Sequence, residues 1–280
     1  MDVTLLHLSD LHFHRLPRQP RSWLGKRGLG ALNLVLRRNR DFPLARARAL
    51  VRHVAELEWD HLVITGDLTQ LGQEEEFALA RRELEPLLAR GPARVTILPG
   101  NHDRYVLEQP GQPGFAEYFG EFFPSHEGLA AKSLGGPWWL AAWDSTLPTP
   151  ALQAWGLVRP ETLAATERWL GGLPAGARVA LASHYPLHFP ASHRSHRHHE
   201  LRNLQHVRDW LARQPIELYL HGHIHRNWVL PVSGGAVPLL AVNSASSTQR
   251  PARGAASHFH RLSLPAQASQ PPQAHPLRLD

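Results

Sequence analysis

An apolar run that ends in two potential metal ligands stands at residues 3–12: Val3-Thr4-Leu5-Leu6-His7-Leu8-Ser9-Asp10-Leu11-His12. Its first part predicts a short buried β-strand that Ser9-Asp10 ends. The same arrangement, an apolar run followed by Asp, Asn or His, recurs further along the chain. The blocks are Asp10-Leu11-His12, Gly66-Asp67, Gly100-Asn101-His102-Asp103, Ser183-His184 and Gly222-His223-Ile224-His225. Because ligands gather beyond the carboxyl ends of strands in open α/β sheets, we expect these blocks to meet in one cleft.

Strands and helices alternate in the predicted order. Apolar runs rich in β-branched residues predict strands at 61–65 and 94–98, and a segment of helical periodicity at 73–90 lies between them. This order favours parallel strands joined by crossover helices. Further strands are predicted at 138–143, 178–182, 216–220, 228–231, 237–242 and 258–264, and further helices at 160–170 and 200–213. Since the last strands follow one another without helices, we predict an α/β protein with a two-sheet sandwich.

Composition limits the class of protein. The 280 residues suit one large domain, or at most two, and 42% hydrophobic with 19% charged residues is typical of a globular protein. The absence of cysteine excludes disulfides and thiolate metal sites, so His, Asp, Asn or Glu must hold any metal. No run approaches the ~20 apolar residues of a spanning helix, and the run at 3–8 is too short for a signal peptide. We therefore expect a cytoplasmic protein without a transmembrane segment.

The net charge is +6, and nearly all the positive residues are arginine. A basic surface favours polyanionic partners such as phosphorylated substrates, nucleic acid or anionic lipid. The scattered arginines, with abundant Ala, Pro and Gly, are equally explained by genomic base composition. Both interpretations stay open.

Paired ligands lie at two places in these blocks. Carboxylate, amide and imidazole groups are the oxygen and nitrogen donors that divalent transition metals bind. In Asp10-x-His12 and His223-x-His225, alternate residues point the same way if the backbone is extended, so each pair can reach one site.

Glycine precedes the ligands in three of the blocks, at Gly66, Gly100 and Gly222. We expect these glycines to adopt unusual dihedral angles beside a crowded centre. Each block alone has an ordinary explanation; Gly100-Asn101-His102-Asp103, for example, is typical of a turn and helix cap. Their common order, each after an apolar strand, favours a metal site instead.

The blocks resemble the signature of the calcineurin-like metallophosphoesterase family, which is D-x-H, G-D, G-N-H-D/E, H and G-H-x-H. The resemblance extends from residue 3 to about residue 262, and Trp143-Asp144-Ser145 and the segment 156–170 agree with it. It implies an αββα sandwich of the metallophosphoesterase type, which we place in a single domain over 1–264. Residues 265–280 are rich in Pro, Gln and Ala, and we expect them to form a disordered tail.

The resemblance also implies a ligand set for two divalent transition-metal ions. The implied ligands are Asp10, His12 and His225 for one ion and Asn101, His184 and His223 for the other, with Asp67 shared. Nitrogen and oxygen donors suit Mn, Fe, Co or Zn. A hydroxide bridging the two ions would attack phosphorus directly. His102 would act as the general acid, and Asp103 would orient its imidazole.

A basic amphipathic insert is predicted at about 15–41. Within 21–40, apolar residues such as Trp23 and Leu36 alternate with basic residues such as Arg27 and Arg37. Such a helix could contact an anionic membrane at its inner face. It could also cap the active site, or only pack on the domain.

A histidine-rich run at 188–199 follows His184, and we expect it to form a rim of the cleft. Within it, Arg194 and Arg197 could pair with a substrate phosphate. Arg202 and Asn203, at the start of the next helix, are further candidates for substrate binding. A solvated loop would explain the same composition.

These features together predict a hydrolase of phosphodiester or pyrophosphate bonds that acts on a small nucleotide or lipid-linked substrate. With its histidine intact, Gly-Asn-His-Asp resembles the cyclic-nucleotide and glycerophosphodiester phosphodiesterases. The basic insert favours an alternative, the UDP-diacylglucosamine pyrophosphohydrolases, whose main form has Arg at the position of His102. A nuclease is disfavoured because no aromatic and basic residues interleave as in a nucleic-acid groove. A non-catalytic scaffold is disfavoured because every ligand position is present.

Overall fold

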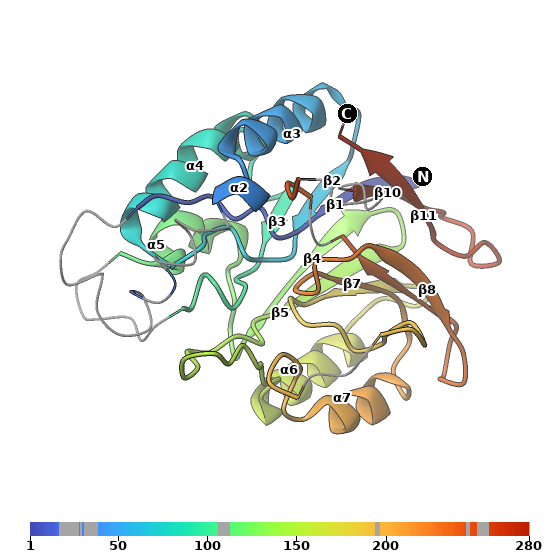
Figure 1. Ribbon diagram of the computed structural model, residues 1–280. Helices are drawn as coiled ribbons and strands as arrows, with labels where there is room; N and C mark the ends of the chain where they lie inside the picture. The colour runs from blue at the N-terminus through green and yellow to red at the C-terminus, as the bar shows by residue number, and fades with distance from the viewer. Residues whose placement is uncertain are drawn as a thin grey trace.

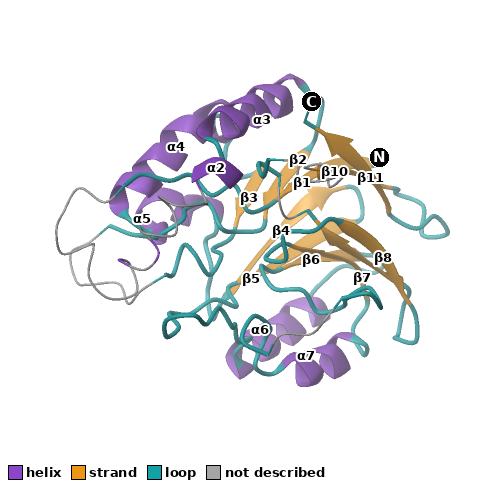
Figure 2. Cartoon of the chain, in the orientation of Figure 1, coloured by secondary structure: helices purple, strands orange, loops and turns teal. Residues whose placement is uncertain are grey.

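Two β-sheets face each other at the centre of the molecule, and helices cover their outer faces (Figure 1, Figure 2). The computed structural model describes residues 1–16, 28, 30, 39–105, 113–193, 197–244, 247–250 and 258–279. Among these residues, no helix is both long enough and apolar enough to cross a membrane.

The first sheet has the strand order β11-β10-β1-β2-β3. Its strands are β1 (Val3–Leu8), β2 (His61–Ile64), β3 (Val95–Ile97), β10 (His258–Leu264) and β11 (Gln273–Arg278). β1, β2 and β3 are parallel, whereas β10 and β11 add antiparallel at the edge. The helices that follow these strands are α2 (Asn39–Asp41), α3 (Leu44–Glu56), α4 (Glu74–Leu88), α5 (Phe115–Phe119) and the short 3₁₀ helix η3 (Gly120–Phe122). Figure 1 shows α3 and α4 along the outer face of this sheet.

The second sheet has the order β4-β5-β6-β7-β9-β8. Its strands are β4 (Leu129–Gly135), β5 (Trp138–Trp143), β6 (Arg178–Ala182), β7 (Ile216–His221), β8 (Trp228–Val232) and β9 (Leu239–Asn243). The four central strands are parallel, and the edge strands β4 and β8 are antiparallel to their neighbours. α6 (Pro160–Gly171) and α7 (Leu204–Leu211) lie on its outer face (Figure 1). The αββα sandwich predicted from the sequence is therefore confirmed.

Alternating side chains of β6 show why its apolar run is unbroken. Ala180 and Ala182 belong to the core between the two sheets, which α3 and α4 extend. Val179 and Leu181 point the other way, into a second core beneath α6 and α7. Because successive side chains of a strand point to opposite faces, a strand covered on both faces needs apolar residues at every position.

The expectation of a disordered tail at 265–280 is wrong for the segment that forms β11. Gln273–Arg278 pairs antiparallel with β10, with His258 opposite Arg278. An edge strand gains backbone hydrogen bonds without needing many apolar side chains, and it tolerates Pro276. Arg178 fixes the connection, because its guanidinium donates to the carbonyl oxygens of Pro265 (2.7 Å) and Gln267 (2.9 Å).

Most of the predicted basic insert, including nearly all of 21–40, lies outside the described residues. Its interpretation as an amphipathic helix stays a prediction from sequence.

Candidate metal centre

Loops from both sheets meet at the carboxyl ends of their parallel strands. The loops after β1 and β2 are joined by hydrogen bonds from Asp10 N to Gly66 O (3.0 Å) and from His12 N to Asp67 O (3.0 Å). The loops after β6 and β7 are joined from Gly222 N to His184 O (3.0 Å). A hydrogen bond from His223 N to Asp10 Oδ2 (3.1 Å) links the two sheets. The predicted ligands are thus held together by the backbone itself.

One cluster of potential ligands contains Asp10, His12, Asp67 and His225, whose donor atoms lie within 4.8 Å of one another. His225 Nε2 lies 3.2 Å from Asp10 Oδ1 and 3.1 Å from His12 Nε2. His12 Nε2 lies 3.9 Å from Asp67 Oδ2. These are the residues expected around one metal ion, together with the shared carboxylate.

A second cluster contains Asp67, His184 and His223. His184 Nε2 lies 3.5 Å from Asp67 Oδ1 and 3.0 Å from Asn101 Oδ1. His223 Nδ1 lies 2.8 Å from the same Asn101 oxygen. Asp67 therefore belongs to both clusters, with Oδ2 toward one and Oδ1 toward the other.

Backbone carbonyl groups orient three of the imidazoles. His12 Nδ1 donates to Thr69 O (3.2 Å), His184 Nδ1 to Thr65 O (2.7 Å), and His223 Nε2 to His199 O (2.8 Å). A carbonyl only accepts, so the nitrogen next to it carries the proton, and the other nitrogen presents a lone pair to the cluster. These partners could not be predicted, because a backbone carbonyl has no signature in the sequence.

The hydrogen-bond acceptors in the two clusters are arranged as bound cations would require. The lone pair of His184 Nε2 faces an oxygen of Asp67, and the lone pair of His12 Nε2 faces the other. Asp10 Oδ1 is buried, and among the described residues no donor meets it with the geometry of a hydrogen bond. Facing acceptors repel unless a cation lies between them, and this mixture of nitrogen and oxygen donors suits divalent transition metals.

Burial and charge set the protonation of these ligands. Burial opposes ionisation of Asp10, but its interactions with His225, and the nearby His184 and His12, hold the pKa of Asp10 well below its ordinary value. Burial lowers the pKa of His184, and it lowers the pKa of His223 well below the ordinary value. An ionised carboxylate and neutral imidazoles are the forms that bind metal.

Four of the proposed ligands have a left-handed backbone conformation, whereas an extended one was expected for the paired ligands. Asp10, His12, Asp67 and His223 have φ angles of 55°, 49°, 53° and 72°. Non-glycine residues rarely adopt this conformation, which costs of the order of 1–3 kcal/mol and concentrates at functional sites. The paired ligands reach their clusters through these sharp turns rather than through the alternation of a strand.

The glycines of the blocks serve different purposes. Gly66 has a φ of 94°, as expected for a residue with an unusual dihedral angle. At Gly100 and Gly222 the constraint is space, since an added Cβ would lie 2.2 Å from Asp67 Oδ1 and 2.5 Å from Asp10 Oδ2, respectively. The carboxylates of the clusters therefore pack directly on glycine backbone.

His102 lies beside the first cluster. Its ring centroid is 5.0 Å from that of His12, and its ring stacks on Tyr105 at 5.5 Å. His102 Nδ1 donates to Gln70 O at 2.6 Å. The contact expected from Asp103 is thus made by the Gln70 carbonyl.

Asp103 holds the loop backbone. Its carboxylate accepts hydrogen bonds from Leu68 N (3.1 Å), Thr69 N (2.9 Å) and Gly100 N (2.9 Å). Burial raises the pKa of Asp103, although these backbone hydrogen bonds oppose the rise. These contacts favour a structural role over the predicted role of orienting His102.

Among the four residues predicted to bind substrate, those that the structure describes differ in their contacts. Arg194 lies outside the described residues, and Arg197 is exposed. The Arg202 guanidinium stacks on Trp155 at 3.9 Å. Both amide atoms of Asn203 bond to the backbone of Val158, at 2.8 and 3.3 Å. Asn203 therefore ties the start of α7 to the segment that precedes α6.

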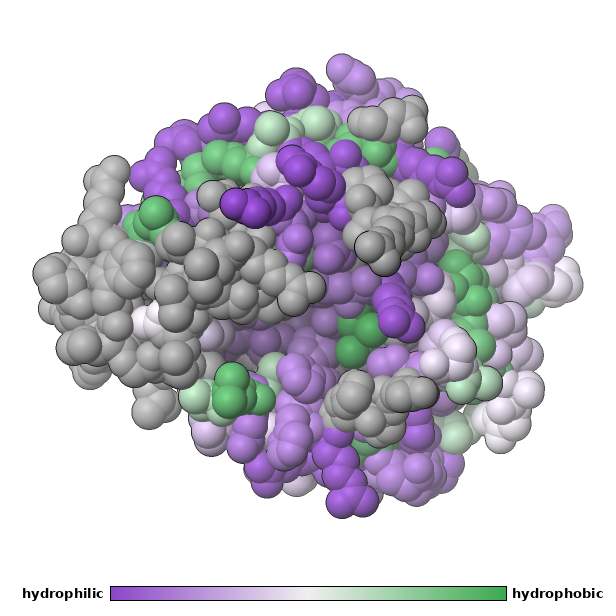
Figure 3. Space-filling model, viewed as in Figure 1, coloured by the Kyte–Doolittle hydropathy of each residue, from purple (hydrophilic) through white to green (hydrophobic). Residues whose placement is uncertain are grey.

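A cavity of about 450 Å³ adjoins both clusters. It is lined by Ser192, His193, His199, His223, Ile224, His225 and Arg226. On the face of the molecule that Figure 3 shows, hydrophilic residues predominate among the coloured ones, with hydrophobic ones in separate small patches. Arg226 was not among the predicted site residues, although it directly follows the last block, whereas His199 belongs to the histidine-rich run that was expected to form a rim of the cleft.

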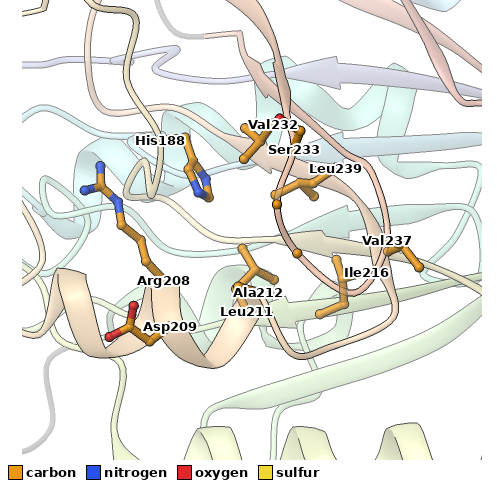
Figure 4. Close-up of a pocket in the computed structure, with 12 residues that line it drawn as sticks. His188, Arg208, Asp209, Leu211, Ala212, Ile216, Val232, Ser233, Val237 and Leu239 are labelled. Atoms are coloured by element: carbon orange, nitrogen blue, oxygen red, sulfur yellow. The ribbon is translucent and has the colours of Figure 1, made fainter.

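A second, smaller cavity of about 180 Å³ lies beside α7 (Figure 4). Leu211, Ile216 and Leu239 are among the apolar side chains that line it, and His188 and Arg208 lie on one side. None of the predicted metal ligands lines this cavity, so it is distinct from the candidate centre.

Comparison with known proteins gives a family and a fold. Residues 3–227 match the family described as calcineurin-like phosphoesterase. A dimetal phosphatase from Danio rerio has a similar structure, with a TM-score of 0.64, 12% identity and 99% of both chains covered. PhoD has a TM-score of 0.59 at 9% identity, with 99% of this chain and 68% of that chain covered. For purple acid phosphatase PPD1 from yellow lupin (Lupinus luteus), the TM-score is 0.53 at 11% identity, with 99% and 54% covered. At these identities the structures show a shared fold. Among curated proteins, none matches the chain.

Proposed function

Because the chain belongs to the calcineurin-like phosphoesterase family, and is therefore a metal-dependent phosphoric ester hydrolase, we propose that it hydrolyses phosphodiester or pyrophosphate bonds beside the two clusters. The observation that carries this proposal is the position of Asp67, whose two carboxylate oxygens face different clusters. A shared carboxylate is what a two-metal hydrolytic site requires.

The proposed ligands are those implied by the resemblance. Asp10, His12 and His225 would hold one divalent ion, Asn101, His184 and His223 the other, and Asp67 would contribute to both. When bound, the ions would activate a water molecule as the nucleophile and neutralise charge on the phosphoryl group. Mn, Fe, Co and Zn all suit this donor set.

His102 is proposed as the general acid. Its Nδ1 proton is donated to the Gln70 carbonyl, which leaves Nε2 for the substrate. A proton delivered from Nε2 to the leaving oxygen would contribute ~10²–10⁴-fold to the rate. Asp103 would support this group indirectly, by fixing the backbone of the Gly100 and Leu68 loops.

The substrate is proposed to be a small phosphorylated compound, either a nucleotide or a glycerophosphodiester. The lipid-linked alternative, and contact of 21–40 with an anionic membrane, rest on the sequence of the basic insert. A cytoplasmic location stays part of the proposal, as expected from the sequence. Deleting residues 21–40 should weaken binding to anionic vesicles if the insert is interfacial, and unchanged binding would remove the lipid-linked alternative.

Hydrolysis by metal-loaded protein tests the proposal. The panel is a cyclic nucleotide, a glycerophosphodiester, a UDP-linked lipid and a phosphomonoester, each before and after chelation. We expect turnover of a diester or pyrophosphate that chelation abolishes and added Mn²⁺, Co²⁺ or Zn²⁺ restores. Turnover that survives complete metal removal would contradict the proposal.

A further inference from the structure

The cavity beside His225 and His223 has a polar lining that suits an anion. Apart from Ile224, the described residues that line it carry hydroxyl, imidazole or guanidinium groups, and none of these described residues is a carboxylate. In a site of this kind, Arg binds a phosphoryl group through two parallel charge-assisted hydrogen bonds.

From this lining we infer that Arg226, assisted by His199, binds a second phosphoryl group of the substrate next to the one that is attacked. The inference rests on the proposed function and narrows it to substrates with a pyrophosphate linkage or an equivalent second anionic group.

Arg226 is held in position by its backbone while its side chain is exposed. Asn243 Nδ2 donates to Ile224 O (2.9 Å) and to Arg226 O (2.6 Å), and Asn243 itself is fully buried. Within the described part of the chain, the Arg226 guanidinium has no acidic partner, and it follows His225 directly. A fixed backbone and an unengaged cation are suited to capture of a ligand from solvent.

His199 lies beside His223 of the second cluster. Its carbonyl accepts from His223 Nε2 (2.8 Å), and the two ring centroids are 6.2 Å apart. This backbone contact places the His199 ring in the cavity lining. His193, which also lines the cavity, stacks on Phe189 at 4.5 Å and is thereby held against the wall.

The position of Arg226 next to a proposed ligand has a consequence for specificity. Neighbouring phosphoryl groups of a pyrophosphate share one oxygen, so a group bound beside His225 brings the next one within reach of residue 226. A simple diester carries only one charge and gains less from this cation. The structure therefore favours pyrophosphate-linked substrates over simple diesters.

The test compares Arg226→Ala and Arg226→Lys with Arg213→Ala, an exposed arginine beyond the end of α7. Steady-state kinetics are measured on metal-loaded protein with UDP-glucose and bis(p-nitrophenyl) phosphate. We expect Arg226→Ala to reduce the preference for UDP-glucose over bis(p-nitrophenyl) phosphate, measured as the ratio of their kcat/KM values, about tenfold. The change should lie mainly in a higher KM for UDP-glucose, and Arg226→Lys should recover part of it. Arg213→Ala should behave as the unchanged protein does.

Binding of inorganic pyrophosphate by calorimetry gives a readout independent of turnover. We expect Arg226→Ala to weaken it about tenfold, and His199→Ala to weaken it less. The inference would be overturned if Arg226→Ala hydrolysed the diester, kept the substrate preference of the unsubstituted protein and bound pyrophosphate with the same affinity. The proposed function would remain intact in that case. If the unsubstituted protein hydrolyses neither compound, the proposed function fails, and the calorimetry alone decides whether Arg226 binds the anion.

Discussion

The backbone N–H of His102 donates to Oδ1 of Asp67 at 2.8 Å, across 35 residues of sequence. The hydrogen bond fixes the carboxylate common to both clusters relative to the residue proposed as the acid. Because the donor is a backbone group, replacing the His102 side chain should leave Asp67 in place. Metal binding and proton transfer can therefore be separated by substitution.

Replacing His102 with Ala should lower kcat by ~10²–10⁴-fold while the protein keeps its metal. Metal content is measured by plasma mass spectrometry and kcat with the best substrate of the panel. If metal content fell in proportion to kcat, His102 would be a structural residue and not the acid.

Replacing Asp67 with Ala should empty both clusters, since its oxygens face each of them. We expect about two ions per chain in the unsubstituted protein, and a loss of affinity of more than ~100-fold for both in the variant. Retention of one tightly bound ion would show that the clusters are independent.

Replacing Gly100 with Ala tests the close approach of backbone to Asp67. The new Cβ would lie 2.2 Å from Asp67 Oδ1, so the loop must move, at a cost of about 1–3 kcal/mol in the free energy of unfolding. Gly171→Ala, near the end of α6, is the matched control because an added Cβ there meets nothing within 4 Å. Both variants are compared by urea unfolding without metal, and equal stability would contradict the crowding argument.

Glu76 should make stability fall as pH rises. Burial raises the pKa of Glu76 to about 8 from the ordinary value of 4.5, against the opposing effect of backbone hydrogen bonds from Leu71 and others. Between these values the folded protein binds more protons than the unfolded chain, so the contribution is complete below pH 4.5 and is lost as pH rises toward 8. The unfolding free energy relative to Glu76→Gln should therefore decrease from pH 5 to pH 8. A difference that stays constant over this range would rule out the raised pKa.

The strands that lead into the proposed ligands could be predicted, because in each case an apolar run and the ligand residues are adjacent in the sequence. β1 ends at Leu8, two residues before Asp10, and β7 ends at His221, directly before Gly222 and His223. Two of the edge strands carry a weaker signal: β4 is only partly buried, and β11 is largely exposed, since backbone pairing and not burial stabilises them. Neither was predicted.

Other features of the site could not be predicted for a different reason. The left-handed turns at Asp10 and Asp67 arise from hydrogen bonds between loops that are distant in sequence. Gln70 meets His102 Nδ1 with its backbone carbonyl (2.6 Å) and with its side-chain Nε2 (3.3 Å), and nothing in the sequence marks this pairing. Adjacency in sequence does not determine which group the ring of His102 meets, so the role expected of Asp103 stays a prediction that its contacts with backbone groups do not favour.

The clusters draw their ligands from both halves of the sandwich, with Asp10 and Asp67 from the first sheet and His184 and His225 from the second. An ion bound in either cluster would join residues from both halves, and is therefore a cross-link that the unfolded chain cannot form. At a concentration one hundred times its dissociation constant, such an ion would add about 2.7 kcal/mol to the free energy of unfolding. Depletion of metal should then lower the melting temperature along with the activity, so a cell short of the ion would lose the folded protein as well as its turnover.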